Sequence, residues 1–219
     1  MPIELPLFPL NTVLFPGAEI PLHIFESRYR LMINECYAYN QPFGIVLARP
    51  ESQPLYEKPY AVGTVAEIEV LDRVEDGRMN LIARGSRRFR ILSQHRQKPY
   101  LCGLVEDYDD VAEDWQDLSE VTHRASELFH SYVETLLAVA GREEIEFSLP
   151  GDSEELSHFI AHLMDIQDEE KQHMLELTST RQRLEEEITL LRREVPFMRQ
   201  ILIMSQRYRE NAPDKSMLN

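Results

Sequence analysis

Cysteine is scarce in this chain, and its scarcity excludes two kinds of site. The 219 residues include only Cys36 and Cys102, which lie far apart and belong to no CxxC or Cys/His cluster. Neither a disulfide framework nor a zinc site is therefore expected, and a reducing cytoplasm is the predicted location.

No stretch approaches the roughly 18 uncharged apolar residues that a membrane span needs. Prolines also interrupt the first apolar residues, so a signal peptide is not expected and we predict no membrane partner.

The chain also lacks the motifs of nucleotide and peptide-bond chemistry. A Walker A loop needs a Gly-Lys step to hold phosphates, but none of the eight glycines is followed by lysine. No serine stands in a GxSxG elbow, and none of the four lysines lies near a serine in a peptidase-like context. We therefore predict a protein that is not an enzyme, with no ATPase, no peptidase and no cofactor.

One pair of histidines has the spacing of metal ligands on a helix. His158 and His162 are four residues apart, but the intervening Phe-Ile-Ala lacks the glutamate that acts as general base in HExxH. We favour a surface or helix-capping role for both histidines over a catalytic metal, and predict no metal site.

Negative charge is concentrated in the second half. Residues 1–105 contain 12 Lys and Arg against 11 Asp and Glu, whereas residues 106–219 contain 11 against 27, which together give the net charge of −15. An acidic surface repels a phosphate backbone. Nucleic acid is therefore a disfavoured partner.

The opening residues form an extended, proline-rich segment. "LPLFPLNTVLFPGAEIPLHIFESRY" (residues 5–29) contains four prolines, which exclude a helix and suit edge strands and turns. A helix is expected after this segment, with Ser27 as its N-cap and an apolar stripe formed by Tyr29, Met32, Ile33, Cys36 and Tyr37.

The rest of the first half shows the pattern of β-strands. Ala66, Ile68 and Val70 alternate with glutamates, which predicts a half-buried strand with these three residues on one face. The Asp76-Gly77 step predicts a hairpin turn in which these residues supply the positive φ angles. "FGIVLA" and "YLCGLVEDY" predict two more strands.

The second half shows helical periodicity. Alternation ends in the acidic residues 106–119, and Gly141 and Asp152 then mark a helix C-terminus and a helix N-cap. A short helix is expected within residues 168–177, and a long one from near Ser179. The first helix presents a stripe of Val121, Ala125, Leu128, Phe129, Tyr132 and Leu136; the last presents a heptad seam of Leu184, Ile188, Leu191, Val195, Met198, Leu202 and Ser205, with Pro196 inside it.

Three ordered motifs resemble one known family. "LPLFPLNTVLFPG…IPLHIFESRYRLMI", "GTVAEIEVLDRVEDGRMNLIARGSRRFRIL" and "STRQRLEEEITLL" are similar to the opening, the second signature and the closing helix of the Lon protease N-terminal, substrate-binding domain. The resemblance implies an α+β fold: a PUA-like β pseudo-barrel with one helix, followed by an α-helical bundle ending in a long helix. We place the β subdomain at residues 1–110 and the helical subdomain at 119–211, which together form one Lon N-terminal-type domain.

The function that this resemblance implies is non-catalytic recognition of polypeptide, linked to proteolysis or protein quality control. The partner would be a client polypeptide or a partner protein. The turn Ile201–Met204 is apolar nearly all round, because consecutive helical residues point about 100° apart; it could bind such a partner or join two copies of the chain. The candidate binding residues are Met198, Ile201, Ile203, Met204, Phe25 and Tyr29.

The alternative is a PUA-like nucleic-acid-binding module. Its candidate residues are the arginines of one hairpin, Arg84, Arg87, Arg88 and Arg90. One aromatic residue, Phe89, accompanies them, which is a small footprint for nucleic acid. We favour ion pairing of these arginines with Glu67, Glu69 and the acidic second half.

Overall fold

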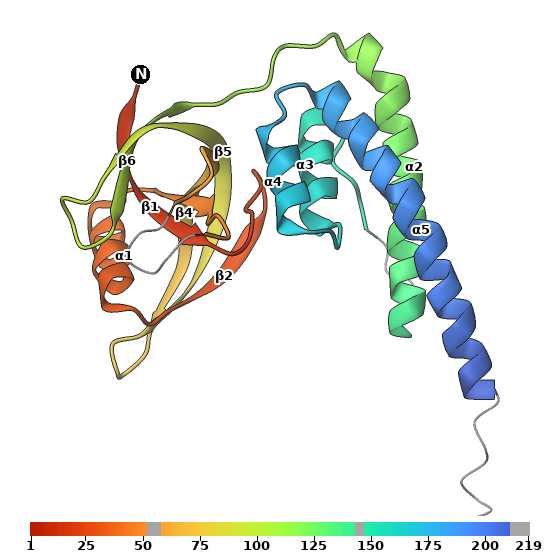
Figure 1. Cartoon of the computed structure of the whole chain (residues 1–219), viewed down its shortest axis with the longest axis horizontal. Helices are drawn as coiled ribbons and strands as arrows, with labels where there is room; N and C mark the ends of the chain where they lie inside the picture. Colours follow the sequence, from red (N-terminus) through yellow and green to blue (C-terminus); the bar gives the residue numbers. More distant parts are fainter. Residues whose placement is uncertain (52–57, 143–146, 211–219) are drawn as a thin grey trace, which may run out of the picture.

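The first half of the chain folds into a pseudo-barrel (Figure 1). The computed structural model describes residues 1–51, 58–142 and 147–210, with the side chains of 205–210 left aside. The sheet order is β2-β5-β4-β3-β1-β6, and β5 also pairs with β6, which closes five strands into a ring. This arrangement confirms the predicted fold class. The elements are β1 (Ile3–Leu10), β2 (Glu19–Ile24), α1 (Ser27–Tyr39), β3 (Phe43–Leu47), β4 (Val62–Arg73), β5 (Met79–His95) and β6 (Leu101–Asp107).

Within the described residues, four helices follow the barrel, at the positions that the sequence predicts. They are α2 (Trp115–Ala140), α3 (Ser153–Leu163), α4 (Asp168–Glu176) and α5 (Thr180–Glu210). The Asp152 side chain accepts hydrogen bonds from the first backbone N–H groups of α3, and Gly141 ends α2 in the left-handed conformation with φ of 65°. The predicted last residue of the bundle, 211, lies outside the described residues. Among the described residues, no helix combines the length and the apolar character needed to cross a membrane.

The long helix α5 packs along α2 in the same direction. Arg181 and Arg199 of α5 contact the Asp117 carbonyl and the Ser131 hydroxyl of α2 in the same order along both helices. The heptad seam is buried from Leu184 to Val195, and Met198 is partly buried against the same core. Pro196 lies inside a continuous helix. The predicted seam is confirmed to that point, and the side chain of its last member, Ser205, lies outside the described residues.

The prolines of β1 lie where the strand changes neighbour. The sequence favours an edge strand here, but β1 has a neighbour on each side: β6 along Ile3–Leu7 and β3 along Leu7–Leu10. Pro6 pairs only with β6 and Pro9 only with β3. Each proline therefore lies beside one neighbour, so its missing N–H does not interrupt a ladder on both sides. Only Pro21, in the edge strand β2, follows the expectation for strands.

A β-bulge corrects the predicted face of β4. Ile68 pairs with Ala83, but Val70 pairs with Ile82, so the register shifts by one residue between them. A bulge reverses the side-chain alternation beyond it. Val70 is consequently 53% exposed instead of facing the core with Ala66. The following hairpin forms at the expected position, with Gly77 at φ 82°, but Asp76 does not adopt positive φ.

Apolar contacts join the two halves. Val13, Phe15 and Leu47 of the barrel half form one buried cluster with Ala161 of α3 and Met174 of α4. The connecting segment after β6 is held as well: the Val111 N–H donates to the Thr178 carbonyl at 2.8 Å. A division into units at residues 1–110 and 119–211 stays a prediction.

Candidate functional site

A cleft of about 970 Å³ lies between the barrel and α3. In Figure 1, α3 and α4 lie between the barrel and the α2–α5 pair. One wall comes from the segment before β2, from β2 itself and from the hairpin of β4 and β5; the other comes from α3 and the residues before it. The lining residues are Pro16, Gly17, Ala18, Glu19, Glu67, Ile68, Glu69, Arg84, Gly85, Ser86, Pro150, Asp152, Glu154, Glu155, His158, Phe159, His162 and Leu163.

Gly85 allows the two parts of the barrel wall to approach each other. Its N–H donates to the Ala18 carbonyl and its carbonyl accepts from the Gly17 N–H, both at 2.8 Å. A Cβ atom at this position would lie 2.4 Å from the Phe15 carbonyl oxygen. Any other residue would therefore push the segment before β2 away from β5 and change the shape of the cleft.

Carboxylates dominate the walls of the cleft. Arg84 donates to Glu19 at 2.7 Å and to Glu69 at 2.6 Å, so its charge is shared by two acidic residues. The Asp152 carboxylate caps α3 by accepting from the backbone N–H groups of Glu154 and Glu155. The walls therefore carry excess negative charge after these pairings.

Apolar side chains also face the cleft. Ile68 comes from β4, and Phe159 and Leu163 come from α3. Leu163 is 45% exposed, and Ile68 and Phe159 are partly buried. These side chains give a ligand apolar surface to bury.

His158 is the one buried histidine that borders the cleft. It is 2% exposed, and both ring nitrogens lack a hydrogen-bond partner among the described residues. The nearest carboxylate oxygen, from Glu154, is 3.9 Å from its Nε2. Burial lowers the pKa of His158 well below 6.5, and the charges of Arg183 and Arg88 lower it further. The ring is therefore neutral, and the predicted surface or capping role is wrong for His158 because the side chain is buried.

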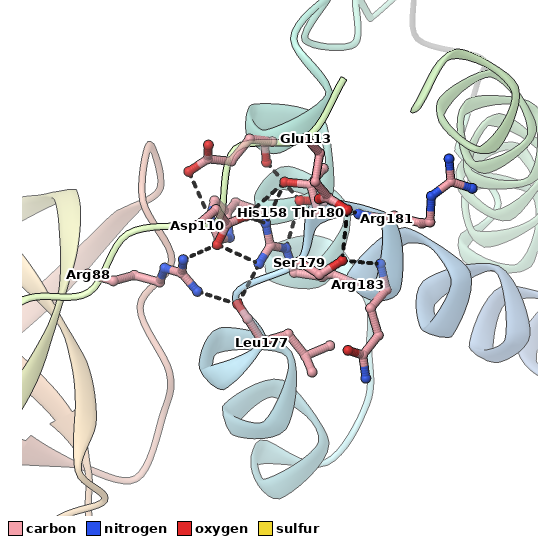
Figure 2. A network of polar contacts seen from close by, with 12 residues as sticks. Arg88, Asp110, Glu113, His158, Leu177, Ser179, Thr180, Arg181 and Arg183 are labelled. Atoms are coloured by element: carbon pink, nitrogen blue, oxygen red, sulfur yellow. Dashed lines mark hydrogen bonds and ion pairs between the residues drawn. The ribbon is translucent and has the colours of Figure 1, made fainter. Parts of the chain in front are cut away.

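Behind His158 lies a buried ion cluster that joins the two halves. Figure 2 shows the Asp110 carboxylate between the guanidinium groups of Arg88 and Arg183. Arg183 donates to it at 2.5 Å and Thr180 at 2.8 Å, and Arg88 forms a further ion pair with it. The three charged side chains are at most 4% exposed. Burial would raise the pKa of Asp110, but the hydrogen bond and charge of Arg183, with the charge of Arg88, hold it below its usual value.

The two arginines also satisfy backbone carbonyls at the end of α4. Arg88 donates to Leu175 at 2.8 Å and to Leu177 at 2.6 Å, and Arg183 donates to Leu177 at 2.9 Å. Carbonyls at a helix C-terminus lack intrahelical partners, so these donors complete their hydrogen bonding. The cluster thus fixes β5, the connecting segment and the start of α5 to one another.

The cluster does not have the character of a metal centre. Ligand atoms of Asp110, Glu154 and His158 lie within 4.8 Å of one another. However, both Asp110 oxygens already accept hydrogen bonds from Arg88, Arg183 or Thr180. Two guanidinium charges beside the same carboxylate oppose the binding of a cation. The geometry favours a structural ion cluster.

The predicted nucleic-acid residues do not form a free basic surface. Arg84 pairs with Glu19 and Glu69, Arg87 with Asp107, and Arg90 with Glu106. Arg88 is buried in the ion cluster, so it cannot contact a phosphate backbone without unfolding. Acidic partners therefore offset the arginines. Glu69 is one of them, as the sequence suggested, but the other suggested partner in β4, Glu67, forms no ion pair with these arginines among the described residues.

The predicted apolar residues of α5 are not part of the cleft. Ile201, Ile203 and Met204 are 40–68% exposed, whereas Met198 is partly buried in the helical core. None of the four lines the cleft. Their role in association stays a prediction.

Phe25 and Tyr29 have opposite environments. Phe25 is 62% exposed and stacks on His23, with ring centroids 6.2 Å apart. Tyr29 is 4% exposed and packs on Phe8, with ring centroids 4.2 Å apart. Tyr29 is therefore part of the barrel core, because its helix turns it inward, and it is not available as a binding residue.

Sequence reasoning missed the cleft itself. Its two walls come from residues about 60 to 150 positions apart in the chain, and no motif links them. The available local signals were the outward-facing Glu67 and Glu69 and the acidic first turn of α3, Glu154 and Glu155. These signals indicate exposed acidic residues, but they do not show that the two groups face one cavity.

A family model described as the ATP-dependent protease La (LON) substrate-binding domain matches residues 4–193. Curated relatives include the Lon protease of Anaeromyxobacter dehalogenans, 30% identical over 94% of this chain and 24% of that protein. Lon protease 2 of Myxococcus xanthus is 29% identical over 94% of this chain and 25% of its own length. The chain thus spans about a quarter of the length of these curated relatives.

Solved structures are similar over most of the chain. The crystal structure of a Lon N-terminal domain protein from Xanthomonas campestris has a TM-score of 0.63 and 26% identity, covering 84% of this chain and 96% of that one. The N-terminal domain of Mycobacterium avium complex Lon protease has a TM-score of 0.65, covering 86% of this chain and 98% of that one. Its identity is 17%, so this second similarity concerns the fold alone.

Proposed function

Because the chain belongs to the Lon substrate-binding domain family, we propose that it recognises polypeptide segments and binds them in the cleft between the barrel and α3. The resemblance inferred from its motifs is confirmed by the family match. The substrates of a protease are polypeptides, so a domain that binds such substrates needs a surface for a peptide chain. The cleft is the described surface that best meets this need.

The observation that carries the proposal is the form and lining of the cleft. Its volume of about 970 Å³ is at the upper end of the range of ligand sites. Leu163 is an exposed apolar side chain within it, with Ile68 and Phe159 partly buried beside it. Burial of apolar side chains is the main source of affinity for an unfolded polypeptide.

Recognition is proposed to occur without catalysis. His158 lacks a hydrogen-bonded hydroxyl or thiol among the described residues, and the carboxylate oxygens of Asp110 are occupied by arginine and threonine donors. A nucleophile needs an adjacent base within hydrogen-bond reach. A link to proteolysis or quality control would then come from delivery of the bound chain to another protein. A cytoplasmic location stays a prediction.

A pair of leucine substitutions tests the cleft. Leu163→Gln removes apolar surface from the cleft, and Leu136→Gln makes the same change at a leucine of α2 with 40% exposure, close to the 45% of Leu163. Binding of a fluorescently labelled, permanently unfolded polypeptide is measured by anisotropy. We expect Leu163→Gln to weaken binding roughly tenfold, because the change removes one apolar contact, and Leu136→Gln to leave it unchanged.

Two results would contradict the proposal. One is an absence of binding by the unaltered chain to any unfolded polypeptide. The other is equal binding by the unaltered chain and Leu163→Gln, which would place recognition elsewhere, with the exposed turn of α5 as the next surface to test.

A further inference from the structure

The charges of the cleft indicate which polypeptides it would select, which rests on the proposed function above. Among the described residues, six carboxylates line the cleft, from Glu19, Glu67, Glu69, Asp152, Glu154 and Glu155, against one guanidinium, that of Arg84. His158 adds no positive charge, because burial and nearby arginines hold its pKa well below 6.5. We propose that the cleft selects cationic segments of unfolded polypeptides in which Lys or Arg flanks an apolar side chain.

Two carboxylates on opposite walls remain available to such a segment. Glu67 comes from β4 and Glu155 from the first turn of α3. Within the described residues, no ion pair or side-chain hydrogen bond is found for the carboxylate of either one, in contrast to Glu19 and Glu69, which hold Arg84. A chain that crosses the cleft would therefore meet an unpaired negative charge on each side.

The helix terminus does not reverse this preference. The N-terminus of α3 would by itself attract an anion. However, Asp152 accepts the N–H groups of Glu154 and Glu155 at 2.9 and 3.0 Å, so two of the terminal donors are already occupied by a carboxylate. Two further acidic side chains occupy the same turn. The wall formed by α3 is therefore suited to cations.

The cleft also supplies an apolar contact between the charged walls. Leu163 is 45% exposed, and Ile68 is partly buried beside it. A simple cation has no apolar surface to bury at this place. A Lys or Arg that flanks an apolar side chain can use both the carboxylates and this apolar surface, so a polypeptide matches the cleft better than a simple cation.

A panel of short synthetic peptides of equal length tests the selection. One peptide combines lysines with leucines, a second has the leucines with neutral polar residues, a third has the leucines with glutamates, and a fourth has the lysines without leucines. Binding to the full chain is measured by anisotropy at low and high salt. We expect the first peptide to bind roughly tenfold more tightly than the second, the third and fourth to bind least, and salt to weaken the first most.

Matched charge variants locate the effect. Glu67→Lys with Glu155→Gln changes the two unpaired wall residues, whereas Glu127→Lys with Glu134→Gln makes the same change at exposed residues of α2. We expect only the first variant to lose the preference for the cationic peptide while still binding the neutral apolar one.

The outcomes separate this inference from the function on which it rests. If the peptides with leucines bind equally at every charge, the selection for cations is wrong and polypeptide recognition stands. If both double variants lose the preference equally, the net charge of the protein is responsible and the cleft does not select. If no peptide and no unfolded protein binds, the proposed function itself is wrong.

Discussion

Two neighbouring arginines of β5, Arg87 and Arg88, have opposite environments. Arg87 belongs to the solvent-exposed surface of the barrel, and Arg88 belongs to the buried cluster between the two halves of the chain. Arg87 lies on the outer surface, where it pairs with Asp107 at 2.9 Å and both side chains are about half exposed. Arg88 points inward, where its ion pair with Asp110 is at most 4% exposed. Successive residues of a strand face opposite sides of the sheet. Arginine therefore has two roles in this strand. On the outer face it keeps the surface charged and soluble, and on the inner face it joins the two halves of the chain.

The physical difference between these regions is desolvation. An exposed ion pair gains little, because water screens the attraction and both side chains lose rotamer freedom. In a buried cluster, each charge depends on its partners, since removing one leaves the others without solvent. The cluster around Asp110 also ties residues from β5, the connecting segment and α5 together. Its integrity is therefore expected to decide how stably the halves are joined.

The largest expected effect comes from removing the central carboxylate. Asp110→Asn leaves Arg88 and Arg183 buried without a counter-charge, and should reduce the free energy of unfolding by about 3–5 kcal/mol. Denaturant unfolding followed by circular dichroism measures this loss.

Asp107→Asn is the matched change on the outer surface. It removes only the partner of Arg87 and should cost about 0–1 kcal/mol. Equal costs for the two variants would show that burial does not distinguish these pairs, and the comparison would fail.

A smaller effect is expected from acidification, through His158. Its folded-state pKa lies well below 6.5, so the unfolded chain binds a proton at a pH at which the folded chain does not. Stability from this residue is therefore present above pH 6.5 and is lost as pH falls below it, by up to about 1.4 kcal/mol per pH unit. We expect the free energy of unfolding of the unaltered chain to decrease relative to that of His158→Gln as pH is lowered through this range.

The comparison with His158→Gln is needed because Glu187 acts in the opposite direction. Glu187 is fully buried, and burial raises its pKa well above 4.5. Its contribution to the free energy of unfolding is lost as pH rises from 4.5 toward that raised pKa. In the unaltered chain, the pH dependences of stability from Glu187 and His158 therefore offset each other. The difference between the unaltered chain and His158→Gln cancels the contribution of Glu187. A difference that does not change with pH would contradict the proposed environment of His158.

The smallest effect on stability is expected at the exposed turn of α5. Ile201 and Met204 are 40% and 68% exposed, so Ile201→Glu with Met204→Glu should change the free energy of unfolding by no more than about 0.5 kcal/mol per site. The same double substitution should abolish association with a partner or a second copy, because it places charges on an apolar surface. Sedimentation of the purified chain measures self-association, with Leu92→Glu as the control, at a leucine of β5 with 45% exposure.

Two results would count against a role of this turn in association. Unchanged association of the double variant would assign contact between copies to another surface. A large loss of stability would show that the turn packs within the folded chain.

Much of the local structure could be predicted from the sequence. Alternation placed β4, the runs "FGIVLA" and "YLCGLVEDY" placed β3 and β6, and apolar periodicity placed α2 and α5. Gly141 ends α2 and Asp152 caps the start of α3, as the chemistry of these residues predicts. The sequence was a poorer guide to which side chains point into the core. A bulge after Ile68 turns Val70 outward. Tyr29 of α1 lies in the core, whereas Phe25 before this helix is exposed.

The sequence by itself determined most of the strands and helices, the caps Gly141 and Asp152, the absence of a Gly-Lys step and the uneven distribution of charge. The expected N-cap Ser27 is wrong, because Ser27 is the first residue of α1 and Glu26 is the N-cap. These properties depend on a few consecutive residues, whose backbone preferences and periodicity act over short distances along the chain. Only the tertiary structure decided that Arg88 meets Asp110 and Arg183, and that Glu67 and Glu155 face one cleft. The burial of a charge and the shape of a cavity depend on which distant segments come together, and that depends on packing of the whole chain.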